Sequence, residues 1–166
     1  RPRDWSSDVC SSDLCALRGM QVTVQDRQEA TLAKVIQRAA KLYKKKLKKP
    51  RLVQEVLDRL TPDINGLGVA QADVVIEAIY EDVDAKQSLY RELEPKMKPG
   101  ALLATNTSSI PIEVLSDCLG DATRLVGINF FTPVAMLQVV EILPGNNTVP
   151  QVSARAAAFT PLFEGL

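Results

Sequence analysis

Apolar positions alternate between strand spacing and helix spacing in the first third of the chain. Residues 15–19 resemble a helix end closed by glycine, and residues 21–25 alternate apolar and polar side chains as a strand does. Apolar residues at steps of three and four then predict a long helix that ends before Pro50. A shorter helix is predicted over residues 53–60 and is closed off by Thr61–Pro62.

The same alternation continues to the end of the chain. Residues 74–76 form a short, fully apolar run, typical of a strand covered on both faces, and helical spacing then extends from residue 84 to residue 97. The remaining expected elements are strands at residues 101–104, 125–131 and 137–143 and a helix at residues 111–119. Strands that alternate with helices predict an α/β fold with a doubly wound, mostly parallel, Rossmann-type sheet.

Composition excludes several classes of protein. Twenty basic residues balance twenty acidic ones, so no overall field attracts nucleic acid or an anionic membrane. The three cysteines are an odd number without CxxC spacing, which argues against a disulfide framework, a zinc site and secretion. No apolar run approaches the roughly 20 residues that span a bilayer. We expect a cytoplasmic protein without a metal. Because its net charge is zero, any anionic ligand must be bound by groups at the binding site itself.

Ligands of an open parallel sheet bind beyond the carboxyl ends of its strands. Asp26 ends a predicted strand, where a carboxylate can bind both ribose hydroxyls of NAD and would repel the additional phosphate of NADP. A helix N-cap is an equally open interpretation of Asp26. The glycine-rich loop G-x-G-x-x-G that cradles a pyrophosphate is absent, and Ser-Asp repeats stand in its place. The expected sheet therefore lacks its first strand and glycine loop.

Three other polar groups follow predicted strands. The acidic run at residues 77–82, with Lys86 after it, is more typical of a solvated helix start than of a ligand site. Residues 105–109 are five consecutive polar side chains, more than a cap needs, and Ser109 is placed to cap the next helix. Glu141 interrupts an apolar strand, where a carboxylate is costly unless something pairs with it.

Several motifs in this order resemble the 3-hydroxyacyl-CoA dehydrogenases, in particular the dehydrogenase part of the multifunctional bacterial fatty-acid oxidation subunits. The motifs are residues 101–111, the Phe-Phe-x-Pro-Val run at residues 130–134 and the Val-Glu pair at residues 140–141. The resemblance extends from Cys15 to about Thr148. It implies oxidation of L-3-hydroxyacyl-CoA to 3-ketoacyl-CoA with NAD in fatty-acid β-oxidation, and a helical C-terminal domain for substrate contacts and dimerisation.

The resemblance also implies roles for individual residues. Asp26 matches the ribose-binding acid of the family, and Ser108 matches the serine that hydrogen-bonds the substrate 3-oxygen beside the cofactor. Glu141 matches the acid that orients the catalytic histidine. The other positions that match cofactor contacts are Ile79, Tyr80, Glu81, Lys86 and Thr132.

The expected histidine is replaced by Asn129, and the chain contains no histidine. An amide does not titrate, so losing the general base is expected to slow oxidation roughly 10²- to 10⁴-fold. Two main hypotheses stay open: a fragment of the dehydrogenase, or a catalytically silent nucleotide-binding or structural module. A dehydrogenase of free hydroxy acids is a third. The basic stretch at residues 44–49 either attracts the phosphates of an acyl-CoA or is a solvated helix end.

The first fourteen residues differ from the rest of the chain. The sequence Ser-Ser-Asp-Val at residues 6–9 is nearly repeated at residues 11–14, without helix or strand periodicity. The repeat resembles a translated adapter sequence, and a disordered tail is the alternative. We therefore expect a non-native or disordered leader at residues 1–14, an NAD-binding domain at residues 15–150 and the truncated start of a following helix at residues 151–166.

Overall fold

The computed structural model describes residues 10–130 and 140–163. These form two compact units. In the described part, the first comprises residues 10–68 and 162–163, and the second comprises residues 69–130 and 140–161. The sequence suggested no division of the domain. In the described residues the strands form a two-stranded sheet and a separate four-stranded sheet.

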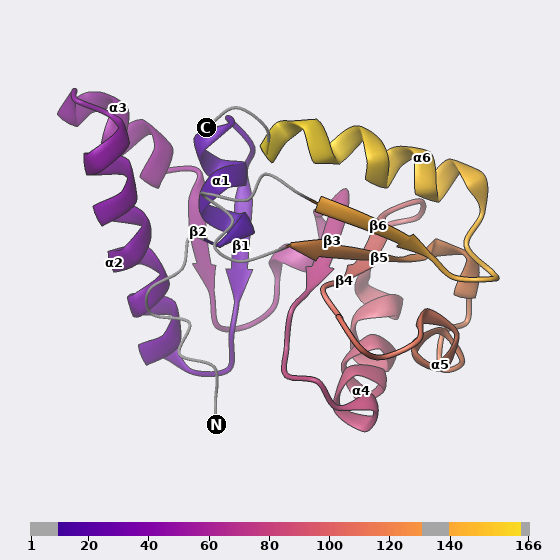
Figure 1. The fold of residues 1–166 in the computed structure, drawn as a ribbon. Coiled ribbons are helices and arrows are strands. Elements are labelled where there is room, and N and C mark those ends of the chain that lie inside the picture. The colour runs from indigo at the N-terminus through magenta and orange to yellow at the C-terminus, as the bar shows by residue number, and fades with distance from the viewer. Residues whose placement is uncertain (1–9, 131–139, 164–166) are drawn as a thin grey trace. The chain divides into compact units, whose positions relative to one another are not determined.

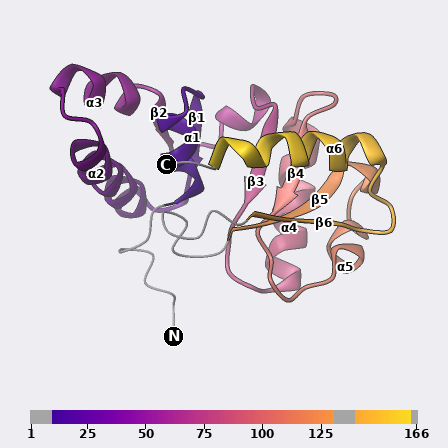
Figure 2. The same ribbon diagram turned by 45° about the horizontal axis from the view of Figure 1, so that its top comes forward.

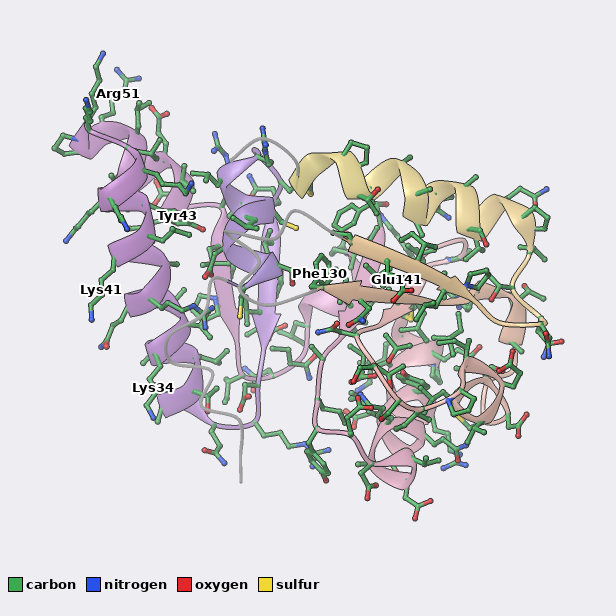
Figure 3. All side chains as sticks on the ribbon, in the orientation of Figure 1. Lys34, Lys41, Tyr43, Arg51, Phe130 and Glu141 are labelled. Carbon is green, nitrogen blue, oxygen red and sulfur yellow. The ribbon has the colours of Figure 1, made fainter. Side chains whose placement is uncertain are left out.

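The first unit is a parallel strand pair with three helices (Figure 1). Its elements are α1 (Ser11–Leu17), β1 (Val22–Gln25), α2 (Glu29–Lys46), α3 (Pro50–Leu57) and β2 (Leu60–Asp63). The apolar stripe of α2 is buried at Leu32, Ala39 and Tyr43, and the Tyr43 hydroxyl donates to the Asp13 carbonyl oxygen at 2.8 Å. Lys34 and Lys41 extend from α2 away from β1 (Figure 3).

Two local expectations for the first unit are wrong. The alternative of disorder is wrong for residues 11–14, because helix α1 begins at Ser11 and the Asp13 carboxylate is buried against the Arg38 guanidinium at 2.9 Å. The non-native origin of the leader stays a prediction, and its residues 1–9 lie outside the described residues. The Thr61–Pro62 segment was expected only to end a helix. It is part of a strand, because Pro62 pairs with Val24 in the β1–β2 ladder. A proline is tolerated there because β2 is an edge strand of its sheet in the described residues.

The second unit is a four-stranded sheet in the order β3-β4-β5-β6. Its elements are β3 (Val74–Glu77), α4 (Val83–Leu93), β4 (Leu102–Thr105), α5 (Ile112–Ser116), β5 (Leu125–Phe130), β6 (Val140–Pro144) and α6 (Pro150–Phe159). Short 3₁₀ helices lie at Gly68–Ala70, Glu94–Lys96, Ala122–Arg124 and Thr160–Phe163. Strands β3, β4 and β5 are parallel and β6 is antiparallel to β5, so the mostly parallel sheet predicted from the sequence is confirmed.

Helices cover both faces of this sheet, with α4 and α5 on one side and α6 on the other (Figure 2). On the α4–α5 side, Tyr90 and Leu115 pack with Leu103 and Leu125 in one cluster of buried side chains. Helix α6 contacts β4, β5 and β6 and begins with Pro150 as its first helical residue. It therefore packs on the larger sheet, and the prediction that residues 151–166 are the truncated start of a following helix stays a prediction.

The close approach of β5 and β6 gives a stability test at Gly127. A Cβ at this position would lie 2.8 Å from the Leu143 Cβ and 3.1 Å from the Leu143 carbonyl oxygen. We expect Gly127→Ala to reduce the free energy of unfolding by about 1–3 kcal/mol, because the strands must separate to admit the methyl group. The measurement is chemical denaturation followed by circular dichroism.

Gly120→Ala is the matched control, since the nearest atom to its added Cβ is Glu94 Oε2 at 3.6 Å, an ordinary contact. We expect this control to change the unfolding free energy by less than about 1 kcal/mol. Equal losses in the two variants would contradict the packing argument.

Candidate functional site

The strand ends of the second unit bring polar side chains to one edge of the sheet. The parallel strands β3, β4 and β5 end at Glu77, Thr105 and Phe130, and the antiparallel strand β6 begins at the same edge with Val140. The polar turn at residues 105–109 therefore leaves the sheet where a parallel α/β fold binds its ligands.

The Glu77 carboxylate is the centre of this polar edge. The residue is 3% exposed and its two oxygens accept four hydrogen bonds. Oε1 accepts from Lys86 Nζ and from the Ile79 amide, each at 2.7 Å, and Oε2 accepts from the hydroxyls of Tyr90 at 2.7 Å and Thr105 at 2.8 Å. Burial and the nearby carboxylate raise the pKa of Tyr90, so its phenol remains a proton donor.

The Lys86 side chain is fully buried, with its ammonium beside Glu77. It also donates to the Ile79 carbonyl oxygen at 3.1 Å and lies 3.5 Å from Glu81 Oε1. The expected solvated helix start is therefore wrong for Glu77 and Lys86. The interpretation as a helix start holds for Asp82, which caps α4 by accepting a hydrogen bond from the Ala85 amide at 2.8 Å.

Glu81 ties this buried pair to the polar turn after β4. Its Oε2 accepts from the hydroxyls of Thr107 at 2.8 Å and Ser109 at 2.7 Å. Partial burial opposes ionisation of Glu81, but the bonds from Ser109 and Thr107 and the charge of Lys86 outweigh it and lower the pKa. Ser109 is thus held by Glu81 and does not cap α5, whose N-cap is Pro111.

Ser108 lies between the two anchored residues of the turn and is exposed. The Thr107 hydroxyl also accepts from the amides of Ser109 and Ile110, at 3.4 and 3.1 Å. These bonds fix the backbone on both sides of Ser108, so its side chain is presented to solvent from an ordered turn.

Asn129 and Glu141 are direct partners in the antiparallel β5–β6 ladder. Opposite residues in such a ladder have Cα atoms about 4.5–5.5 Å apart and side chains on the same face, so the two side chains are within reach of each other. Glu141 is exposed, and Figure 3 shows it on β6 beside Phe130 of β5. Its charge therefore remains in water, and the burial cost expected from the apolar strand does not arise.

The other predicted cofactor residues lie at two strand ends. Asp26 follows β1 in the first unit, and its Oδ1 accepts from the Gln28 amide at 2.7 Å. The N-cap of α2 is Gln28, so the N-cap interpretation of Asp26 is wrong. Ile79 is half-buried and Tyr80 is 70% exposed, directly after β3. Thr132 lies outside the described residues.

Sequence reasoning missed Tyr90 and Thr105 and misjudged Glu77. A signal was present, because Lys86 and Tyr90 stand four residues apart and so share one face of α4. An acidic residue that ends an apolar strand, followed by a lysine and a tyrosine on one helix face, could have indicated a buried carboxylate with its donors.

A basic depression lies between α2 and α3 in the first unit. It has a volume of about 500 Å³, and its lining includes the cations Lys44 and Lys48 and the apolar side chains Leu47, Val53 and Leu57. The depression combines positive charge with apolar surface, which the sequence alone did not show.

The described residues offer a suitable group for the ribose of NAD but fit its pyrophosphate less well. Asp26 offers a carboxylate at the end of β1, as a ribose site requires. The Cys10 amide at the beginning of α1 donates to the Asp13 carboxylate at 3.3 Å, so an acidic side chain occupies the first turn where a phosphate would need backbone donors. No helix in the described residues is long and apolar enough to cross a membrane.

Parallel strands, helices on both faces of the larger sheet and polar turns at the strand ends define a Rossmann-type nucleotide-binding fold. The chain belongs to the 3-hydroxyacyl-CoA dehydrogenase family, because residues 11–163 match the model of the NAD-binding domain of that family. This membership confirms the resemblance seen in the sequence. The domain that this model describes is an NAD-binding domain, so NAD is the cofactor.

Solved structures of similar proteins agree with this assignment. The chain is 28% identical to 3-hydroxybutyryl-CoA dehydrogenase from Escherichia coli, with a TM-score of 0.84 over 92% of this chain and 33% of that one. It is 28% identical to FadB2 of M. tuberculosis, with a TM-score of 0.86 over 93% of this chain and 56% of that one. It is 27% identical to (S)-3-hydroxybutyryl-CoA dehydrogenase PaaH1 from Ralstonia eutropha, with a TM-score of 0.85 over 92% and 55%. The chain thus spans between a third and just over half of these structures.

The buried ion pair predicts a large effect of Lys86→Met. Removing the ammonium leaves the Glu77 carboxylate buried without its countercharge, so we expect unfolding to become easier by roughly 3–5 kcal/mol. Glu77→Gln combined with Lys86→Met should recover most of this loss, because it removes both charges. Chemical denaturation measures the unfolding free energy of the single and the double variant.

Lys96→Met is the control for the lysine substitution. Lys96 pairs with Glu92 at 3.1 Å with both side chains about half exposed, 49% and 48%. A surface pair of this kind contributes at most about 1 kcal/mol. If Lys86→Met were no more destabilising than Lys96→Met, the buried pair would not have the importance assigned to it.

The lowered pKa of Glu81 predicts a pH-dependent effect of Ser109→Ala. A carboxyl group with a lowered pKa in the folded state stabilises the fold above its ordinary value of 4.5 and loses this contribution as pH falls through the lowered pKa. We expect Ser109→Ala to cost about 1 kcal/mol at neutral pH, and the difference from the unsubstituted chain to shrink towards pH 2. Unfolding measured between pH 2 and pH 7 tests this, with Ser108→Ala as a pH-independent control in the same turn. A constant difference at all pH values would refute the assignment.

Proposed function

We propose that the protein to which this chain belongs oxidises L-3-hydroxyacyl-CoA to 3-ketoacyl-CoA with NAD, in the β-oxidation of fatty acids. The observation that carries this proposal is the pairing of position 129 with Glu141 at the sheet edge that also bears the turn with Ser108. Two of the similar structures are, by name, dehydrogenases of 3-hydroxybutyryl-CoA, a small member of this substrate class.

In this proposal the chain's own residues hold the substrate, and a histidine at position 129 would take the hydroxyl proton. Ser108 donates a hydrogen bond to the 3-oxygen, and the side chain at position 129 contacts the same oxygen. Glu141, opposite position 129, orients that side chain and would stabilise positive charge on an imidazole there. Bound NAD would supply the acceptor for the hydride of the 3-carbon.

Asn129 limits what this chain can catalyse. Its amide can hold the substrate oxygen but does not take the hydroxyl proton, so turnover is expected to be about 10²- to 10⁴-fold below that of a chain with histidine at this position. We propose that the chain with Asn129 and without a glycine-rich loop is nearly inactive.

The predicted cofactor residues divide into two groups in this proposal. Asp26 binds the adenosine ribose, and Ile79, Tyr80 and Glu81 follow β3, where the nicotinamide half of NAD would pass. Lys86 acts on NAD indirectly, because its buried ammonium is held by Glu77 and lies beside Glu81. Thr132, at a position where the resemblance implies a residue near the nicotinamide, stays a proposed contact.

The depression between α2 and α3 is the proposed contact for CoA. Lys44 and Lys48 supply charge for phosphates, and the apolar residues beside them can pack against an adenine ring. We further propose a cytoplasmic protein, with a C-terminal domain outside this chain that completes the substrate site and forms a dimer.

A catalytically silent nucleotide-binding or structural module is the second candidate function. Asn129 favours it, because no described residue at this edge replaces the missing imidazole. The two candidates differ in whether a histidine at position 129 is sufficient to restore turnover once the other parts of the enzyme are present.

The deciding experiment restores the glycine-rich strand and the C-terminal domain and compares Asn129 with Asn129→His. NADH consumption on acetoacetyl-CoA should rise about 10²- to 10⁴-fold in the Asn129→His protein, since the imidazole supplies the proton-transferring group. Free 3-keto acids without CoA are the substrate control. The absence of turnover in the histidine form, with NADH binding intact by calorimetry, would reject the enzyme in favour of the silent module.

A further inference from the structure

Asn106 is the first residue after β4, and its side chain contacts the end of β5. The backbone ladder between these strands extends to Thr105, opposite Gly127, whereas β5 continues to Phe130. The Asn106 Oδ1 accepts a hydrogen bond from the Phe130 amide at 3.1 Å. The carboxamide thus continues the contact between β4 and β5 beyond the last paired residues of the ladder.

Asn106 is itself held by the polar network of the sheet edge. Its backbone amide donates to the Glu77 carbonyl oxygen at 2.8 Å. The residues on either side are fixed by side-chain bonds, Thr105 to the Glu77 carboxylate and Thr107 to the Glu81 carboxylate, each at 2.8 Å. Asn106 therefore reaches β5 from an anchored backbone.

The bond to Phe130 acts directly on position 129. The Phe130 N–H belongs to the planar peptide group that joins Asn129 to Phe130, so fixing its direction also restrains ψ of Asn129. The direction of that peptide determines how the Asn129 Cα–Cβ bond is aimed relative to Glu141 on β6.

We propose that Asn106 is a positioning residue for the side chain at position 129. The inference rests on the proposed function, in which position 129 and Ser108 contact the same substrate oxygen. Ser108 lies two residues after Asn106 in the same turn. One carboxamide therefore links the turn that carries Ser108 to the strand end that carries position 129, and it holds the two at a fixed separation.

Amide hydrogen exchange in the full chain tests the hydrogen bond. Asn106→Ala should make the Phe130 amide exchange about three- to tenfold faster, the range expected for losing one neutral hydrogen bond. Asn106→Asp keeps an acceptor oxygen and should protect this amide nearly as well as asparagine. The Ile128 amide, in the interior of β5, is the internal reference and should not change.

Equal acceleration at Phe130 and Ile128 would mean that Asn106 contributes only general stability, and it would overturn the proposal. If Asn106→Ala does not fold, Asn106→Ser replaces it, since the shorter side chain also withdraws the acceptor but remains polar. Unchanged exchange at Phe130 in Asn106→Ser would overturn the proposal in the same way.

The second readout reports on position 129 itself. In the Asn129→His chain, the carboxylate of Glu141 should raise the pKa of the introduced imidazole above about 6.5, measured by NMR titration. Adding Asn106→Ala should return this pKa towards the unperturbed value, because the ring is no longer aimed at Glu141, and Glu141→Gln should do so completely. A pKa unaffected by Asn106→Ala would contradict the positioning role.

Neither measurement needs NAD or an acyl-CoA. The positioning role of Asn106 and the proposed function can therefore be rejected independently of each other. If exchange and titration behave as expected while the restored protein does not turn over, the proposed function is wrong and the positioning role of Asn106 stands. Turnover without any response to Asn106→Ala would reject the positioning role alone.

Discussion

The buried pair of Glu77 and Lys86 is the interaction on which the candidate site depends. Two charges removed from water cost several kcal/mol each, roughly, unless their mutual attraction and further hydrogen bonds compensate. Here the carboxylate accepts from four donors, and the ammonium has a carbonyl oxygen and a second carboxylate beside it. In the described residues no buried side-chain nitrogen or oxygen lacks a hydrogen-bond partner.

This pair matters for the candidate site because it connects elements that are far apart in the sequence. Glu77 ends β3, Lys86 lies in α4, and Glu81 joins them to the turn after β4. Asn106 then extends the network to the end of β5. The polar edge is therefore one connected hydrogen-bond network within the second unit, and the exposed Ser108 belongs to its turn.

The family match favours catalytic activity, whereas the amide at position 129 argues against it. The NAD-binding domain match covers nearly the whole chain, and the fold agrees with it. The residue opposite Glu141 in the β5–β6 ladder is an amide, whereas the proposed proton transfer requires an imidazole. The proposed enzyme would therefore have its carboxylate at position 141 but no titrating group at position 129.

The sequence by itself determined the α/β class, most elements and the family, because periodicity and motif order are local properties of the chain. It also showed the missing histidine. Only the tertiary structure decided which charges are buried. Glu77 meets Lys86, Tyr90 and Thr105 across 9, 13 and 28 residues of sequence, and the β2 strand exists only through its pairing with β1. Burial and pairing depend on neighbours that the fold supplies, and spacing along one segment does not encode them.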